Sequence, residues 1–269
     1  GDPSRLVDRL APLARALFSP AGALLWLLAI AALLAQAVAE AGALAAYARE
    51  ALARPSIAGW AALAWLPLKA LHELAHALAL RRFGGAVHEA GVTLMLGLPV
   101  PYVDASSANV LRSRWARARI GAAGMIVEIF IAALAFYLWM LVEPGLLRAV
   151  LFNVMLVAGV STLIFNGNPL LRYDAYYILA DLVELPNLAQ QSARYWGYLL
   201  QRHLFWLQDV ESPARSRAER LWFGFYGLAS AIYRLFVTLA IALFIGGRFF
   251  FIGVLLALFA LTQVFLSLP

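Results

Sequence analysis

The chain has 269 residues, of which 64% are hydrophobic and 13% charged, and it contains no cysteine. This composition excludes an ordinary soluble domain, and the lack of cysteine excludes disulfides, thiolate metal ligands and a cysteine nucleophile. A net charge of +6 would suit nucleic acid. The basic residues gather at the ends of apolar segments, however, so we interpret the charge as a membrane topology and expect no nucleic-acid partner.

Apolar windows of about 20 residues, long enough to cross a hydrocarbon core, recur along the chain. They predict an all-α integral membrane protein with about six transmembrane helices and a short membrane-associated β or loop segment after the second. We expect one transmembrane domain over residues 1–269, with a core over about 57–185 and flanking helices over 22–46 and 221–268. The predicted spans are Gly22–Ala46, Ile57–Leu80, Ile120–Val142, Ala149–Phe165, Leu221–Ile245 and Phe249–Leu268.

Arginines are distributed unevenly between the two sides of these spans. Fifteen fall on the side of the N-terminus and of the two long connections, and four fall on the other side. Because cytoplasmic loops are enriched in basic residues, both termini are expected in the cytoplasm. The fifteen are Arg5, Arg9, Arg15, Arg81, Arg82, Arg112, Arg114, Arg117, Arg119, Arg172, Arg194, Arg202, Arg215, Arg217 and Arg220; the four are Arg49, Arg54, Arg148 and Arg248.

The second predicted span contains the pattern His-Glu-x-x-His, formed by His72, Glu73 and His76. Histidines four residues apart lie on one helical face, where both imidazoles can reach a single ion, and the intervening glutamate can take a proton from an attacking water molecule. A pattern with three fixed residues also arises by chance. Ionisable side chains at membrane depth are costly, which favours a functional site.

A third ligand is expected from another segment near the cytoplasmic side. The segment after the fourth span meets this condition, because Pro169 stops a helix, the residues around it favour a turn, and Asp174 follows within reach. A carboxylate beside two histidines would complete a set of three ligands and leave a fourth position open, as in catalytic zinc sites.

The two ordered motifs, His-Glu-x-x-His and Asn-x-x-Pro-x-x-x-x-Asp, resemble those of the site-2 proteases, zinc metalloproteases that cut within or beside the membrane. Asn166, Pro169 and Asp174 provide the second motif. Short segments around these motifs are most similar to those of the bacterial branch of peptide zinc metalloproteases. The resemblance covers about Lys69–Tyr198. It rests further on Phe83–Gly85, Pro99–Ser106, Gly121–Met125 and Asn168–Asp174.

The resemblance implies an intramembrane endopeptidase that acts on membrane-embedded or membrane-associated proteins and peptides, in the bacterial cytoplasmic membrane. It implies that His72, His76 and Asp174 hold Zn²⁺ and that Glu73 is the general base. Asn166 would orient or polarise the scissile peptide, and Asn168 and Pro169 are expected to contact the substrate. The chain departs from the family at Ala175, where glycine is usual, and at Glu128, in a region where many relatives carry asparagine.

Glu128 lies inside the third predicted span, where an unpaired carboxylate is expensive. The sequence leaves four roles open: a partner to a metal-binding histidine, a proton relay, a fourth ligand, or a structural ion pair with Lys69 or Arg234. His88 is expected to be a loop or surface histidine. Asp104, with Ser106 and Ser107, is expected to form a helix cap before the basic run from Arg112 to Arg119.

The stretch from Gly84 to Tyr102 is too apolar for an exposed loop and too interrupted for a span. Val92–Leu96 is rich in strand-forming residues, and a turn is predicted at Pro99–Pro101. The family resemblance implies a membrane-dipping hairpin or loop beside the active site, where a strand edge would hold an unwound substrate. Simple filling of space between helices is the alternative.

Two alternative functions accompany the protease hypothesis. A metal transporter would use the cluster of histidine and aspartate residues to bind an ion in transit, and a catalytically silent relative would bind substrate without cutting it. Glu73 separates the hypotheses, because a transport site gains nothing from a carboxylate that does not bind the ion.

The arginine distribution predicts sidedness independently of any family. Because the chain has no cysteine, single replacements can be labelled without background. Ser113→Cys and Ser216→Cys should react with an impermeant thiol reagent only when the cytoplasmic face is exposed. Ala51→Cys, in the opposite loop, serves as the control and should react from the other side. Labelling of Ser113→Cys in intact cells would contradict the topology.

Overall fold

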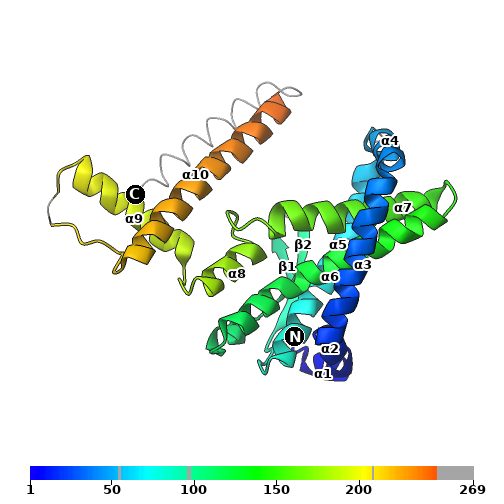
Figure 1. The fold of residues 1–269 in the computed structure, drawn as a ribbon, viewed down its shortest axis with the longest axis horizontal. Coiled ribbons are helices and arrows are strands. Elements are labelled where there is room, and N and C mark those ends of the chain that lie inside the picture. Colours follow the sequence, from blue (N-terminus) through cyan, green and yellow to red (C-terminus); the bar gives the residue numbers. More distant parts are fainter. Residues whose placement is uncertain (54–55, 96–97, 208, 247–269) are drawn as a thin grey trace. The chain divides into compact units, whose positions relative to one another are not determined.

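Helices form most of the chain, together with one small hairpin (Figure 1). The computed structural model describes residues 1–53, 56–95, 98–207 and 209–246. The helices are α1 (Ser4–Arg9), α2 (Ala11–Leu17), α3 (Pro20–Ala39), α4 (Ala41–Leu52), α5 (Ser56–Arg82), the 3₁₀ turn η1 (Ser106–Val110), α6 (Arg114–Leu141), α7 (Leu146–Met155), the π-helical η2 (Leu156–Asn166), α8 (Asp174–Leu182), α9 (Leu188–His203) and α10 (Arg217–Gly246). The strands are β1 (Ala90–Met95) and β2 (Leu98–Val103).

Among the described residues, four helices are long and apolar enough to cross a membrane. They are Pro20–Ala39, Arg114–Leu141, Leu146–Asn166 and Arg217–Leu243. They overlap the first, third, fourth and fifth predicted spans. The helical class is confirmed, with four helices that could cross a membrane by length and composition, while the number six is not confirmed. The sixth predicted span, Phe249–Leu268, lies outside the described residues.

The second predicted span is the 27-residue helix α5. Its apolar sequence is interrupted by Lys69, His72, Glu73 and His76. Helix α5 is therefore not among the four helices that are long and apolar enough to cross a membrane. Its crossing of the membrane stays a prediction.

The first apolar segment is shorter than predicted, because the helix bends at Glu40. Helix α3 ends at Ala39 and α4 begins at Ala41. The backbone hydrogen bonds continue across the bend: Glu40 N donates to Gln36 O at 2.9 Å, and Leu44 N donates to Glu40 O at 2.9 Å. The bend therefore divides the predicted span 22–46 into two helices and leaves 20 residues for the first crossing.

The predicted β segment is a hairpin, but its turn is not where the sequence placed it. β1 pairs antiparallel with β2, and Pro99 and Pro101 lie inside β2 opposite Leu94 and Val92. Asp104 N donates to Glu89 O at 2.8 Å. Hydrogen-bonded and non-hydrogen-bonded pairs alternate in an antiparallel ladder, so both prolines fall at positions where β2 needs no N–H donor toward β1. The strand therefore accepts two prolines, and the turn predicted at Pro99–Pro101 is wrong.

Contacts divide the chain into two compact units, Gly1–Leu179 and Ala180–Pro269; the single-domain organisation stays a prediction. In the first unit, Val7 of α1 and Ala14 of α2 are buried in one core with the C-terminal half of α5 and the start of α6. Arg81 Nε donates to Asp8 Oδ1 at 2.7 Å, which ties the N-terminal helices to the basic end of α5.

A second core in this unit joins α4, α6 and α7. Tyr47 packs edge-on against Trp139 and Phe152, with ring centroids 5.3 and 5.1 Å away. In the second unit, α9 packs on α10: Trp196 Nε1 donates to Gly224 O at 3.1 Å, and a side chain at Gly227 would meet the Trp196 ring.

Candidate metal centre

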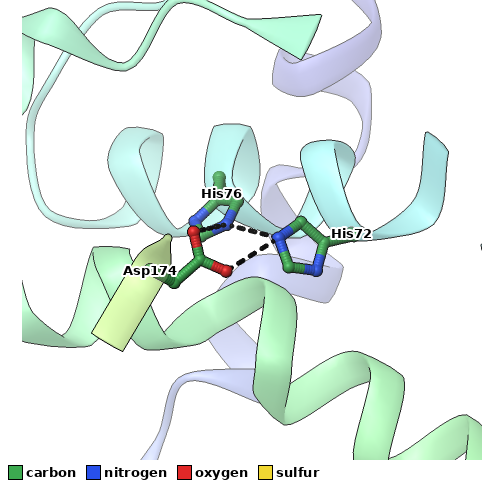
Figure 2. A group of neighbouring side chains, drawn as sticks. All are labelled: His72, His76 and Asp174. Carbon is green, nitrogen blue, oxygen red and sulfur yellow. Dashed lines mark hydrogen bonds and ion pairs between the residues drawn. The ribbon is translucent and has the colours of Figure 1, made fainter. Parts of the chain in front are cut away.

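Two histidines and one aspartate meet where α5 and the start of α8 approach each other (Figure 2). The Nε2 atoms of His72 and His76 are 3.0 Å apart. Asp174 Oδ2 lies 3.0 Å from His72 Nε2, and Asp174 Oδ1 lies 3.7 Å from His76 Nε2. One ligand atom from each residue lies within 4.8 Å of the others, and both histidines are buried. The predicted grouping of these three residues is confirmed as a set that can hold a metal ion.

The chain brings Asp174 to the histidines through a turn after η2. The π-helical hydrogen bonding of η2 ends with Gly167 N donating to Thr162 O, five residues earlier, at 2.7 Å. Asn168 Oδ1 then accepts from Leu170 N at 2.9 Å, and Asp174 is the first residue of α8. Asn168 and Pro169 thus shape the turn that delivers the carboxylate. Their predicted contact with substrate stays a prediction.

Each imidazole presents its other nitrogen to an acceptor on α6. His76 Nδ1 lies 2.7 Å from Ile120 O in hydrogen-bond geometry. His72 Nδ1 lies 3.1 Å from Glu128 Oε2, at ion-pair distance but without the geometry of a hydrogen bond. A metal-binding histidine characteristically gives its second N–H to a carbonyl or carboxylate, which directs the lone pair of the first nitrogen at the ion. With both protons on Nδ1, the two Nε2 lone pairs face each other and Asp174.

This convergence of electron pairs fits a cation. Two unprotonated nitrogens 3.0 Å apart beside a carboxylate would repel one another without a positive charge between them. Asp174 Oδ2 is buried and has no hydrogen-bond donor of suitable geometry within the described part of the chain.

The absence of a side chain at Gly124 allows α6 to approach the His72 ring. A Cβ placed there would lie 2.4 Å from His72 Cε1 and 2.5 Å from its Nε2. Ile120, Gly124 and Glu128 follow one another at intervals of four residues, so they form a single stripe on α6. Along this stripe, the Ile120 carbonyl contacts Nδ1 of His76, Gly124 leaves room for the His72 ring, and Glu128 lies near Nδ1 of His72. In the sequence, Gly124 stands out only as part of the motif Gly121–Met125, and no signal indicates a role for the Ile120 carbonyl.

Glu73, the predicted general base, lies beside the cluster but outside the ligand set. Its Oε2 accepts a hydrogen bond from Val103 N of β2 at 3.2 Å, so the end of the hairpin touches the acid that lies between the two histidines. Asn166 is buried, and its Nδ2 donates to Glu128 Oε2 at 3.2 Å. The structure therefore groups Asn166 with Glu128, while its catalytic role stays a prediction.

Glu128 has the ion-pair role that the sequence left open and also a histidine contact. It lies 3.0 Å from Lys69 Nζ in addition to its approach to His72. The alternative partner, Arg234, belongs to α10 and donates through Nε to Ser230 O at 3.2 Å.

Two other polar candidates lie elsewhere among the described residues. His88 is exposed and is not part of the ligand group. Asp104 Oδ1 accepts from Ser106 N, which lowers the pKa of Asp104. This contact is at the first residue of the 3₁₀ turn η1, which precedes the basic run. The long helix α6 is capped by Ser113, whose hydroxyl accepts from Ala116 N at 3.3 Å.

Comparison of the sequence with protein-family models, with curated proteins and with solved structures finds no significant match.

The ligand geometry predicts that the purified protein binds about one zinc ion per chain. Replacing His72, His76 or Asp174 by alanine should remove most of the bound zinc, because three protein ligands leave little redundancy. Metal analysis of the detergent-purified variants checks this, with His88→Ala as the control for loss of an exposed histidine. Full zinc occupancy in Asp174→Ala would exclude that residue from the site.

Contact between α6 and His72 predicts that Gly124→Ala displaces the imidazole and weakens zinc binding by about tenfold or more. The matched control is Gly159→Ala, where the added Cβ would lie 3.6 Å from Ala132 Cβ, an ordinary contact. Zinc affinity measured by competition with a chelator distinguishes the two. Equal affinity in Gly124→Ala and wild type would show that the histidine is not held by this approach.

Proposed function

We propose that the chain is an intramembrane zinc metalloendopeptidase that hydrolyses peptide bonds of membrane-embedded or membrane-associated substrates. The observation that carries this proposal is the ligand group of His72, His76 and Asp174, with a non-ligating carboxylate, Glu73, between the two histidines in the sequence. Four helices in the described part of the chain are apolar enough to cross a membrane, which supports the location of the substrate. The separated motifs that resemble the site-2 proteases support the reaction.

Each residue has a distinct task in this proposal. A zinc ion bound by the three ligands would supply Lewis acidity to the scissile carbonyl and to a water molecule. Glu73 would remove a proton from the attacking water and deliver it to the leaving amine. Asn166 would hydrogen-bond the substrate backbone: one hydrogen bond to Glu128 leaves its amide carbonyl and a second N–H available.

The hairpin is the proposed place where substrate meets the metal centre. Val103 N at the end of β2 contacts Glu73, so a peptide that follows this strand would pass close to the general base. The side chains of Val92 and Leu94 on β1 are exposed, which suits contact with lipid or with an apolar substrate. A peptide bond within a helix is shielded from attack, and an extended segment beside a strand is accessible.

The proposed orientation has both termini in the cytoplasm of a bacterium, with the metal centre near that face of the inner membrane. The ion pair between Arg81 and Asp8 supports one part of this, because it places the N-terminal helices at the same end as the basic end of α5. The arginine distribution supports the rest.

Glu73→Gln separates metal binding from chemistry. It removes the base but no ligand, so zinc should remain bound while hydrolysis falls by at least ~100-fold. The assay uses membrane peptides with helix-breaking residues in liposomes, and Glu143→Gln, at an exposed carboxylate after α6, is the control. Equal inactivity of wild type and Glu73→Gln, with zinc bound in both, would count against a protease. Zinc flux in the same liposomes would then indicate a transporter.

A further inference from the structure

Glu128 has more polar partners than an ion pair requires. Its carboxylate lies within α6 and is 2% exposed. Oε1 accepts from Lys69 Nζ at 3.0 Å. Oε2 accepts from the Thr162 hydroxyl and from Asn166 Nδ2, and it also lies 3.1 Å from His72 Nδ1. One buried carboxylate thus joins α5, α6 and η2.

We propose that Glu128 is a positioning residue that sets the orientation of both the metal ligand His72 and the substrate-binding Asn166, with Lys69 as its counter-ion. The inference rests on the metal site of the proposed function. It goes beyond it by assigning a role to a residue that belongs neither to the ligand set nor to the two motifs.

The orientation of the His72 imidazole depends on what its Nδ1 atom faces. His72 binds an ion through Nε2 only when its proton is on Nδ1, and that N–H needs an acceptor because the ring is buried. Glu128 Oε2 is the carboxylate oxygen that faces Nδ1. A Cβ at position 124 would collide with Cε1, Nε2 and Cδ2 of this ring, so the glycine leaves the space that the ring occupies. Glu128 thus favours one ring orientation and one tautomer, the one that aims Nε2 at Asp174.

Asn166 is held by the same oxygen. Asn166 Nδ2 donates to Glu128 Oε2, and this contact fixes the orientation of the Asn166 amide. In the flipped orientation, the amide carbonyl would face the carboxylate and be repelled by it. Thr162, four residues earlier on η2, donates to the same atom and fixes the carboxylate relative to that helix. A shift of Glu128 would therefore move a metal ligand and the predicted substrate contact together.

Lys69 makes this arrangement possible in an apolar region. A buried carboxylate without a positive partner costs several kcal/mol. Lys69 precedes His72 by three residues, so both lie on one face of α5 and both face Glu128. The charge of the carboxylate is balanced on the Oε1 side. Oε2 is left to accept from Thr162 and Asn166 and to lie 3.1 Å from His72 Nδ1, which a small rotation of the ring would bring into hydrogen-bond geometry.

The test compares an apolar replacement of the whole ion pair with one that keeps an acceptor. In Lys69→Met/Glu128→Met, no charge is left unpaired, so the chain should fold, but the acceptor for His72 is gone. We expect zinc affinity, measured by chelator competition, to fall about 10–100-fold. In Lys69→Met/Glu128→Gln, the amide oxygen can still accept, and much of that affinity should return. Thermal unfolding of the metal-free proteins checks the fold, and Glu143→Gln is the control for loss of a carboxylate.

The visible absorption spectrum of bound Co²⁺ gives a second readout that reports ligand geometry without any substrate. It should differ from wild type in the methionine double variant and approach wild type in the glutamine one. Wild-type affinity and spectrum in Lys69→Met/Glu128→Met would overturn the inference and leave Glu128 as the counter-ion of Lys69 alone. A wild-type protein that binds no metal would instead overturn the proposed function and the inference with it.

Discussion

The close approach of α6 to α5 holds both histidines through one face of one helix. Ile120 contributes a backbone carbonyl, Gly124 an absent side chain and Glu128 a carboxylate, each one turn from the next. Helix α6 therefore orients both imidazoles from the side opposite their Nε2 atoms. The third candidate ligand, Asp174, lies at the start of α8. A ligand set supported in this way needs little rearrangement when an ion enters.

Polar groups are concentrated at this interface in a chain that is otherwise apolar. Of the described side chains that are both polar and buried, most belong to the site: His72, His76, Glu128, Thr162 and Asn166. Each charge or polar atom in such surroundings must be matched by a partner, since the desolvation of an unpaired ionised group costs several kcal/mol. The network around Glu128 meets this condition by sharing one carboxylate among four neighbours, so function and the stability of the buried site depend on the same contacts.

Local patterns in the sequence predicted the parts of the site that depend on helical periodicity. The spacing of His72 and His76 fixes their common face, and the polar turn before Asp174 indicated a segment able to bring a carboxylate to them. What could not be predicted depends on tertiary contact: nothing in the sequence assigns the carbonyl of Ile120 to His76, and the bend at Glu40 leaves the hydrophobic pattern unchanged. The hairpin was predicted in kind but not in detail, because prolines at alternate positions indicate a turn as readily as an edge strand.

The placement of Pro99 and Pro101 affects the tendency of the protein to aggregate through the edge of its hairpin. Both residues lie at the positions of β2 whose backbone groups point away from β1. The outer edge of β2 can therefore accept hydrogen bonds there but cannot return them, since proline has no N–H. A second copy of the hairpin would therefore form an incomplete ladder at Pro99 and Pro101, whereas an extended substrate needs the edge only near Val103, where β2 contacts Glu73. An apolar strand that lies next to the candidate metal centre is thus protected against edge-to-edge aggregation by two missing N–H groups.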